Sequence, residues 1–279
     1  MPQRVLLPHN QQRHIFYRRR RHVRRRPQNP LAKSSAPDQN NRIPLALRCL
    51  LVRTDQRLIL VDTGIGDWHH DKFKQIYQPQ TSDHLAQTLK QQNLTHNDIT
   101  DIILTHLHFD HAGGLIKKTP TGLSPAYPNA RLWIQQKQWD WARNPSPKDR
   151  ASFLAEYLDI IDQAYRYELV EGNATITTGL EVIAYQGHTP AMQCVLLKHP
   201  DRTLFFAADL LPLSSHVRLP WLMAYDLHPL QTLKEKQQLL ENASRHNWLI
   251  VFQHDPTVSA ASVRKKAGKY ELQPEQLNQ

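Results

Sequence analysis

Glycine and cysteine are scarce in this sequence of 279 residues, which holds nine glycines and two cysteines beside nineteen prolines. Two cysteines cannot build a disulfide framework. Because Cys49 and Cys194 lie inside apolar runs, we predict buried free thiols, as expected in a reducing cytoplasm. There is no run of about 18 apolar residues, so we expect no membrane span. The basic N-terminus is not followed by an apolar stretch, so we expect no secretory signal peptide. These absences favour a cytoplasmic protein.

The net charge of +10 is concentrated in one short segment. Residues 1–41 contain ten of the 35 Lys and Arg residues and one acidic residue, Asp38, which leaves 25 basic and 24 acidic residues in 42–279. Binding of nucleic acid requires a basic track, which a nearly neutral body does not supply. We therefore expect a small-molecule substrate and no nucleic acid. A nucleic-acid-binding module that acts through the arginines of 18–26 is the alternative from a different class, and salt-dependent binding by the isolated segment would support it.

The chain divides into two parts at residue 42. Residues 1–41 are rich in Arg, Gln, Asn and Pro and show neither helical nor strand periodicity, so we predict a basic, disordered N-terminal segment. Residues 42–279 are long enough to form one large α/β domain with its own core.

The second part alternates predicted strands with predicted helices. Strands are expected at 45–52, 57–63, 99–104, 131–134, 167–170, 174–177, 180–185, 192–198, 203–208 and 248–252. Helices are expected over 83–94, around Trp139, over 149–165 and from Pro229 onward. This order predicts a layered α/β domain with two sheets between helices.

A dense cluster of histidines follows the predicted strand 99–104. His106 and His108 are two positions apart, so in an extended segment their side chains lie on one face and can bind the same metal ion. Sites at the C-terminal ends of strands are common in open α/β folds. The alternative is an exposed polar loop without a metal.

The same cluster continues through Asp110 and His111. These two residues lie at a turn where the glycine pair 113–114 permits unusual backbone angles, so they can face a second ion nearby. Desolvating three histidines and one aspartate would be costly without a metal. The cluster therefore predicts a metal site.

His-x-His-x-Asp-His followed by Ala-Gly-Gly resembles the signature of metallo-β-lactamase-fold hydrolases. Three later residues fit the same pattern: His188 in Gly-His-Thr-Pro, Asp209 at the end of an apolar run, and His254 in Phe-Gln-His-Asp-Pro. The gaps of 77, 21 and 45 residues are similar to those of the lactonase-like and organophosphate-hydrolase-like branch. The resemblance covers about residues 42–258 and implies a four-layer αββα sandwich.

The resemblance implies a metal ligand at seven positions. The first ion is expected at His106, His108 and His188, the second at Asp110, His111 and His254, and Asp209 is expected to bridge both. Nitrogen and carboxylate ligands suit Zn²⁺, so the expected cofactors are two divalent ions, with zinc favoured. Asp62 resembles the family's aspartate before the first glycine-rich turn, and we interpret it as support for the ligands and not as a ligand.

The implied mechanism is hydrolysis by a hydroxide that bridges the two metal ions. Asp110 is expected to be the catalytic residue that orients the nucleophile or transfers a proton. We expect an ester or lactone substrate, with a phosphoester or organophosphate hydrolase as the alternative within the same fold. Dimers are common among relatives, and the resemblance implies a homodimer as an arrangement to test.

The stretch 216–226 follows Asp209 and is expected to form a wall of the substrate pocket. Its aromatic and apolar residues favour an apolar or acyl group. His216 and Tyr225 are candidates for a hydrogen bond to a substrate oxygen. Trp221 is a candidate for substrate contact, with a role in core packing as the alternative.

The N-terminus departs from the family pattern. Relatives in this branch have a glycine-rich segment similar to DGGAMFGVVPKTLW, where this chain has the arginine-rich residues 18–32. An arginine codon CGG followed by C becomes the glycine codon GGC when it is read one nucleotide later, and suitable codons for 18–32 yield the relatives' segment. We therefore hypothesise that residues 1–35 are a frameshifted translation. A genuine basic arm is the alternative, and resequencing the start of the gene decides between them.

Overall fold

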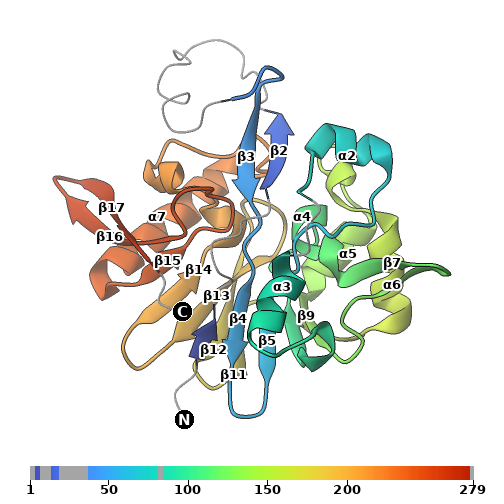
Figure 1. Cartoon of the computed structure of the whole chain (residues 1–279). Helices are drawn as coiled ribbons and strands as arrows, with labels where there is room; N and C mark the ends of the chain where they lie inside the picture. Colours follow the sequence, from blue (N-terminus) through green and yellow to red (C-terminus); the bar gives the residue numbers. More distant parts are fainter. Residues whose placement is uncertain (1–3, 7–13, 19–36, 81–83, 277–279) are drawn as a thin grey trace.

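Two β-sheets form the centre of the computed structural model, which describes residues 4–6, 14–18, 37–80 and 84–276 (Figure 1). The first sheet has six strands in the order β1 (Arg4–Leu6), β4 (Leu50–Arg53), β5 (Leu58–Val61), β6 (Asp101–Ile103), β9 (Arg131–Gln135) and β10 (Arg166–Val170). Neighbours from β5 to β10 are parallel, so the loops after β5 and β6 leave the same edge of this sheet.

The second sheet has seven strands that are neighbours in chain order. They are β11 (Ala174–Thr177), β12 (Leu180–Tyr185), β13 (Met192–Lys198), β14 (Thr203–Phe206), β15 (Leu249–Val251), β16 (Ala260–Lys266) and β17 (Lys269–Glu275). Only β14 and β15 pair in parallel within this sheet.

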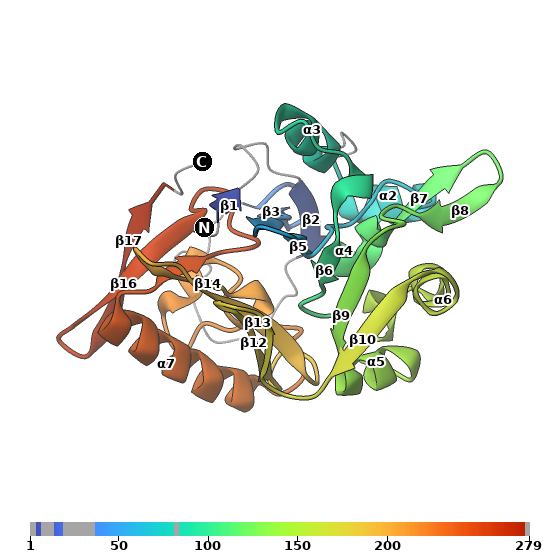
Figure 2. The ribbon, with the colours of Figure 1, turned by 90° about the horizontal axis from the view of Figure 1, so that it is seen from below.

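Helices cover the outer faces of the two sheets. On the side of the first sheet lie α2 (Asp71–Tyr77), α3 (His84–Gln91), α4 (Phe109–Ala112), α5 (Gln136–Arg143) and α6 (Ala155–Ala164). The long helix α7 (Pro229–His246) lies along the second sheet, as Figure 2 shows from below. The layer order is therefore helix, sheet, sheet, helix, which confirms the αββα sandwich.

Alternation along the strands separates the core into two layers. In the first sheet Leu51, Leu60 and Ile102 belong to the apolar cluster beneath the helices. Their neighbours Leu50 and Ile59 point the other way and pack in the cluster shared with the second sheet. This two-residue period is the pattern of a strand that is buried on both faces.

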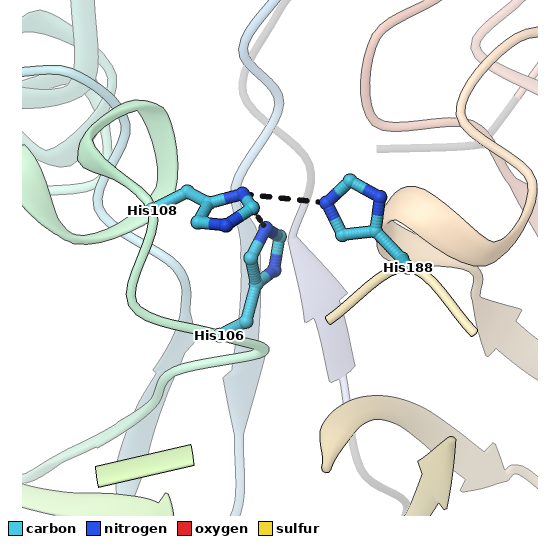
Figure 3. A group of neighbouring side chains, drawn as sticks. All are labelled: His106, His108 and His188. Carbon is cyan, nitrogen blue, oxygen red and sulfur yellow. Dashed lines mark hydrogen bonds between the residues drawn. The ribbon is translucent and has the colours of Figure 1, made fainter. Parts of the chain in front are cut away.

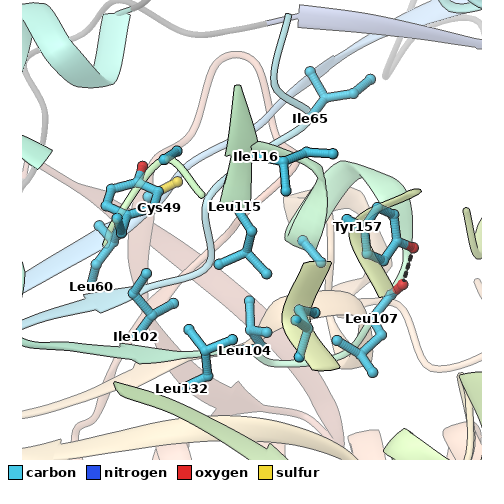
Figure 4. Packing of buried hydrophobic residues seen from close by; sticks show 14 of the residues in the cluster. Cys49, Leu60, Ile65, Ile102, Leu104, Leu107, Leu115, Ile116, Leu132 and Tyr157 are labelled. Carbon is cyan, nitrogen blue, oxygen red and sulfur yellow. Dashed lines mark hydrogen bonds between the residues drawn. The ribbon is translucent and has the colours of Figure 1, made fainter. Parts of the chain in front are cut away.

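A buried tyrosine ties α6 to the loop that follows β6. The Tyr157 hydroxyl donates a hydrogen bond of 2.5 Å to the carbonyl of Leu107, within the core cluster that Figure 4 shows. Burial raises the pKa of Tyr157 above its usual range, so the hydroxyl stays protonated and remains a donor. Leu107 lies between His106 and His108, so this bond fixes the backbone at the start of the histidine cluster.

Two short strands lie inside residues 1–41, where the sequence shows no strand periodicity. β1 pairs antiparallel with β4, and β2 (His14–Arg18) pairs antiparallel with β3 (Arg42–Ala46). Each pairing places one short strand beside a strand of the domain. The arginine-rich residues 19–32 lie outside the described residues, and the proposed frameshift of residues 1–35 and the boundary at residue 42 both stay predictions.

The predicted strand 45–52 is wrong as a single element. It is divided into β3 and β4, because residues 46–48 instead pair with the segment after β15: Ala46 N donates to the His254 carbonyl at 2.9 Å and Arg48 N to the Gln253 carbonyl at 3.2 Å. This pairing joins residues about 200 positions apart and leaves no local signal. The predicted helix 149–165 is also shorter, since a 3₁₀ turn (Arg150–Ser152) precedes α6.

The hairpin of β16 and β17 was not predicted. The first half of β16 is buried, whereas Arg264, Lys265 and Lys266 are exposed, so the polar residues conceal the strand pattern.

The described helices include none that is both long and apolar enough to cross a bilayer. Cys49 and Cys194 are both buried, as predicted.

Candidate metal centre

Seven side chains converge between the open ends of the two sheets. Four of them follow β6 in the sequence. His106 and His108 lie in the loop before α4, with His108 as the N-cap residue of that helix, and Asp110 and His111 lie on α4 itself. The late three come from the second sheet: His188 from the β12–β13 loop, Asp209 from the 3₁₀ turn after β14 (Ala208–Leu210), and His254 from the segment after β15. All seven are buried, with at most 8% of any residue exposed.

The first predicted ligand set comes together as three imidazoles. His108 Nδ1 lies 3.1 Å from His106 Nε2 and 3.3 Å from His188 Nε2, as drawn in Figure 3. One nitrogen of each ring lies within 4.8 Å of the others, close enough for a shared metal ion. His188 is separated from the other two by about eighty positions and reaches them only because the two sheets face each other.

The second predicted set lies beside the first. His254 Nε2 is 3.3 Å from His111 Nε2, and the Asp110 Oδ2 atom is 3.6 Å from His111 Nε2 and 3.8 Å from His254 Nε2. These three side chains also fit a shared ion.

Asp209 lies between the two sets. Its Oδ2 atom is 3.2 Å from His188 Nε2, and its Oδ1 atom is 2.8 Å from His254 Nε2. Each carboxylate oxygen thus faces a histidine of a different set. This is the position that a bridging carboxylate requires.

The glycine pair after the cluster acts differently from our expectation. Neither Gly113 nor Gly114 has a positive φ. A Cβ at Gly113 would lie 2.4 Å from the Ile65 carbonyl oxygen, and a Cβ at Gly114 would lie 2.1 Å from the Thr63 carbonyl oxygen. The pair therefore permits close backbone packing against the loop after β5, and not an unusual backbone angle.

Asp62 supports the second set from behind, as its interpretation from the sequence proposes. Its Oδ2 atom lies 3.0 Å from His111 Nδ1 and accepts the Gln253 amide at 2.8 Å. The Thr105 hydroxyl also donates to Oδ2 at 2.8 Å, and Thr105 N donates to the other oxygen, Oδ1, at 2.7 Å. Because a carboxylate only accepts, the His111 proton lies on Nδ1 and the Nε2 lone pair faces the centre.

Three further imidazoles are oriented in the same way. The Thr105 hydroxyl donates to Asp62, so its oxygen can accept the proton of His106 Nδ1 at 3.1 Å. The Ala46 carbonyl accepts from His254 Nδ1 at 2.8 Å. His188 Nδ1 lies 2.9 Å from Asp226 Oδ1. Each bond leaves the Nε2 atom directed at the centre, which is the orientation of a metal-binding histidine.

Charge at the centre has the sign that attracts cations. Burial and the neighbouring imidazoles lower the pKa of His106 and of His108 well below the usual range, so both rings are neutral. Burial also lowers the pKa of His254, but Asp209 and Asp110 outweigh it and raise this pKa to about 9. The carboxylates therefore favour positive charge here, from protons or from metal ions.

The residues fit two divalent cations. Four buried carboxylates contact the imidazoles: Asp62, Asp110, Asp209 and Asp226. Two divalent ions would balance their four negative charges. Isolated charges of this kind are costly to bury, and lone pairs that face one another need a cation between them.

The three candidate pocket residues differ in their surroundings. His216 is buried in a 3₁₀ turn (Ser214–Val217), and its Nδ1 atom has no hydrogen-bond partner among the described residues. The Tyr225 ring lies 5.9 Å from that of His188, edge to face. Trp221 is only partly buried and stacks with the Arg218 guanidinium at 4.8 Å, so it lies outside the main core. Of the three, Tyr225 has a ring contact with a predicted metal ligand, His188.

Two residues that support the ligands were not predicted from the sequence. Asp226 is the last residue of the stretch 216–226, but a single aspartate in a loop carries no periodic signal. Arg48 donates to the carbonyls of Phe252 (2.8 Å) and Asp255 (2.5 Å), on both sides of His254. Both act on ligands far away in the sequence.

Comparison with known proteins agrees with this geometry. The family model of the metallo-beta-lactamase superfamily matches residues 43–254. An N-acyl homoserine lactonase of Bacillus cereus is 28% identical over 169 residues, which cover 57% of this chain and 60% of the relative. The chain thus matches about 60% of the length of this lactonase.

Solved structures share the fold. A probable metal-dependent hydrolase from Staphylococcus aureus superposes with a TM-score of 0.86 at 21% identity, covering 99% of both chains. AidC, a dizinc quorum-quenching lactonase in complex with its product, superposes with a TM-score of 0.71 at 23% identity, covering 86% of this chain and 83% of AidC.

Proposed function

The chain belongs to the metallo-β-lactamase superfamily, and on this premise we propose that it is a two-metal hydrolase that cleaves a lactone or ester bond. The observation that carries the proposal is the convergence of the seven buried side chains, with Asp209 between two sets of ligands. Such an arrangement is costly to build for structural reasons alone.

Each set would hold one ion. His106, His108 and His188 would bind the first ion, and Asp110, His111 and His254 would bind the second, with Asp209 shared. When bound, the two ions would supply Lewis acidity, which would polarise the substrate carbonyl and make a nearby water molecule more acidic. Zinc is favoured by the nitrogen-rich ligands and by the dizinc lactonase of the same fold.

Asp110 would act as the catalytic carboxylate. It lies on α4 at the shared centre and is 4% exposed, so it is close to any bound substrate and shielded from bulk water. Its carboxylate can orient the attacking water and accept a proton at a carboxylate oxygen. The same oxygen can then return the proton to the leaving alkoxide as the lactone or ester C–O bond breaks.

The pocket wall would orient the substrate through neutral donors. Burial lowers the pKa of His216 to about 3, with Lys236 acting in the same direction, so the ring is neutral at physiological pH. Burial raises the pKa of Tyr225 well above its usual value, so its hydroxyl also stays protonated. Neutral donors of this kind suit an acyl or lactone oxygen, and the aromatic face of Trp221 suits an apolar group.

Two finer aspects belong to the same proposal. The two buried thiols are compatible with the reducing cytoplasm as the compartment. A homodimer remains an expectation, which size-exclusion chromatography with light scattering would test.

A metal analysis combined with a substrate screen tests the proposed function. We expect two equivalents of metal per chain and hydrolysis of N-acyl homoserine lactones or aryl esters, lost in His108→Ala. Phosphotriesters form the third arm of the screen, and faster turnover of these would favour the organophosphate-hydrolase alternative. A protein that binds no divalent metal, or that hydrolyses substrate equally well without one, would overturn the proposal.

A further inference from the structure

Asp226 is a buried carboxylate with one direct partner. It is 2% exposed, and its Oδ1 atom lies 2.9 Å from Nδ1 of His188, itself 1% exposed. The other carboxylate oxygen, Oδ2, has no hydrogen-bond partner among the described residues. Isolated carboxylates are costly to bury, so the His188 contact is the interaction that offsets this cost.

The backbone around Asp226 is fixed against the His188 loop. Leu227 N donates to the His188 carbonyl at 3.0 Å, and His228 N donates to the Gly187 carbonyl at 2.8 Å. The Lys148 ammonium donates to the Asp226 carbonyl. Asp226 is thus held at a defined position relative to the imidazole, and the contact is part of the fold.

The His188 loop is also held from α7. The Glu235 carboxylate accepts Gln186 N at 2.9 Å and Gly187 N at 3.0 Å. Glu235 contacts only the backbone of this loop, so it fixes the position of residue 188 but not the protonation of its ring. The side chain that contacts the ring nitrogen Nδ1 is Asp226.

We infer that Asp226 is a positioning residue, which keeps the His188 proton on Nδ1 and directs the Nε2 lone pair at the first metal ion. This inference rests on the proposed metal centre. A carboxylate behind a histidine fixes its orientation and increases its basicity as a ligand. His111 has the same arrangement with Asp62, so each predicted set contains one carboxylate-backed histidine.

Asp62 and Asp226 differ in the number of side chains to which they are hydrogen-bonded. Asp62 also accepts bonds from Thr105 and Gln253 and so contributes to the fold near β5. Among the described residues, the Asp226 side chain has one hydrogen-bond partner, His188. A substitution at 226 therefore tests support of the ligand with little loss of other bonds.

The test compares Asp226→Asn and Asp226→Ala with the parent protein and with Asp201→Asn, a matched charge change at a side chain that is 90% exposed. Asparagine keeps an oxygen that can accept from Nδ1 but removes the charge, whereas alanine removes both. The measurement is the affinity for each equivalent of Zn²⁺ or Co²⁺ in competition with a chelator. The visible spectra of Co²⁺-loaded His188→Ala and His254→Ala identify which equivalent is weakened.

We expect Asp226→Asn to lower the affinity for one metal equivalent by roughly 10- to 100-fold. The visible spectrum of its Co²⁺-loaded form should resemble that of His188→Ala. Asp226→Ala should lose more, and Asp201→Asn should match the parent. Parental affinity and spectrum for both equivalents in both Asp226 variants would overturn the inference. A parent protein that binds no metal would instead refute the proposed function, so the two failures are distinguishable.

A second measurement needs no variant and holds even if the Asp226 variants do not fold. In a long-range ¹H–¹⁵N spectrum of the Zn²⁺-loaded parent, the proton of His188 should reside on Nδ1. A proton on Nε2 of His188 would contradict the inference directly.

Discussion

Replacing Gly187 with alanine should displace α7 from the loop that carries His188. A Cβ at this position would lie 2.4 Å from Thr232 N, 2.4 Å from Thr232 Oγ1 and 2.5 Å from Thr232 Cα. Because two of these atoms belong to the backbone of α7, a change of side-chain rotamer cannot relieve the contact. The loop or the helix must move instead.

The expected cost follows from the kind of contact. Overpacking of a well-packed interior typically costs about 1–3 kcal/mol in the free energy of unfolding. For a chain of this size each kcal/mol lowers the melting temperature by about 2–4 °C. The displaced residue is adjacent to His188, so Gly187→Ala should also weaken the first metal equivalent. Differential scanning calorimetry and metal analysis measure the two effects.

Two further variants isolate the cause. Gly268→Ala places a Cβ in open space, at a residue whose φ is 76°, so it should cost about 1–2 kcal/mol from backbone strain alone and leave metal content unchanged. Gly187→Ala combined with Thr232→Ala should remain destabilised, because Thr232 N and Cα are still in the way. Parental stability and metal content in Gly187→Ala would refute the reasoning.

The other predictions concern the metal ligands, their support and one buried lysine. His108→Ala should reduce the metal content toward one equivalent and abolish hydrolysis, and two tightly bound equivalents by mass spectrometry would contradict this. Asp62→Ala leaves the donors of Thr105, His111 and Gln253 without their acceptor, so urea denaturation should show a loss of about 3–5 kcal/mol; a loss under about 1 kcal/mol would argue against the role of Asp62. Burial lowers the pKa of Lys236 to about 8 from an unfolded value of 10.5, so the unfolded chain holds a proton that the folded chain has released. The contribution of Lys236 to stability should therefore rise between pH 8 and 10.5, by up to about 3 kcal/mol, and be constant below pH 8, where both states hold the proton. Stability curves of Lys236→Met should lack this rise, and an identical pH dependence in both proteins would exclude it.

The early half of the site could be predicted from the residues alone, because its members are close in the sequence. His106, His108, Asp110 and His111 fall within six positions, so local geometry is enough to group them. The late ligands follow ordinary strand ends. Only the resemblance to a known family indicated His188, Asp209 and His254, since no periodicity connects them to the early cluster.

Interactions between distant segments account for what could not be predicted. The break between β3 and β4 depends on pairing of Ala46 and Arg48 with the segment around His254. Likewise, the close approach at Gly187 depends on where α7 lies, and α7 is placed by the second sheet. Sequence patterns report which face of an element is apolar, but they do not report which other element will cover it.

The arrangement of the ligands also implies how binding and folding are coupled. Each predicted set takes residues from both sheets: His188 from the second sheet joins the first set, and His254 joins the second. Bound cations would therefore link the sheets at their open edge. Deeper between the sheets, the Gln193 amide donates to the carbonyls of Leu104 (2.8 Å) and Trp133 (3.1 Å), a link that needs no metal. The sheets are thus already joined next to the site, so ligand substitutions should act first on metal affinity and only second on the fold.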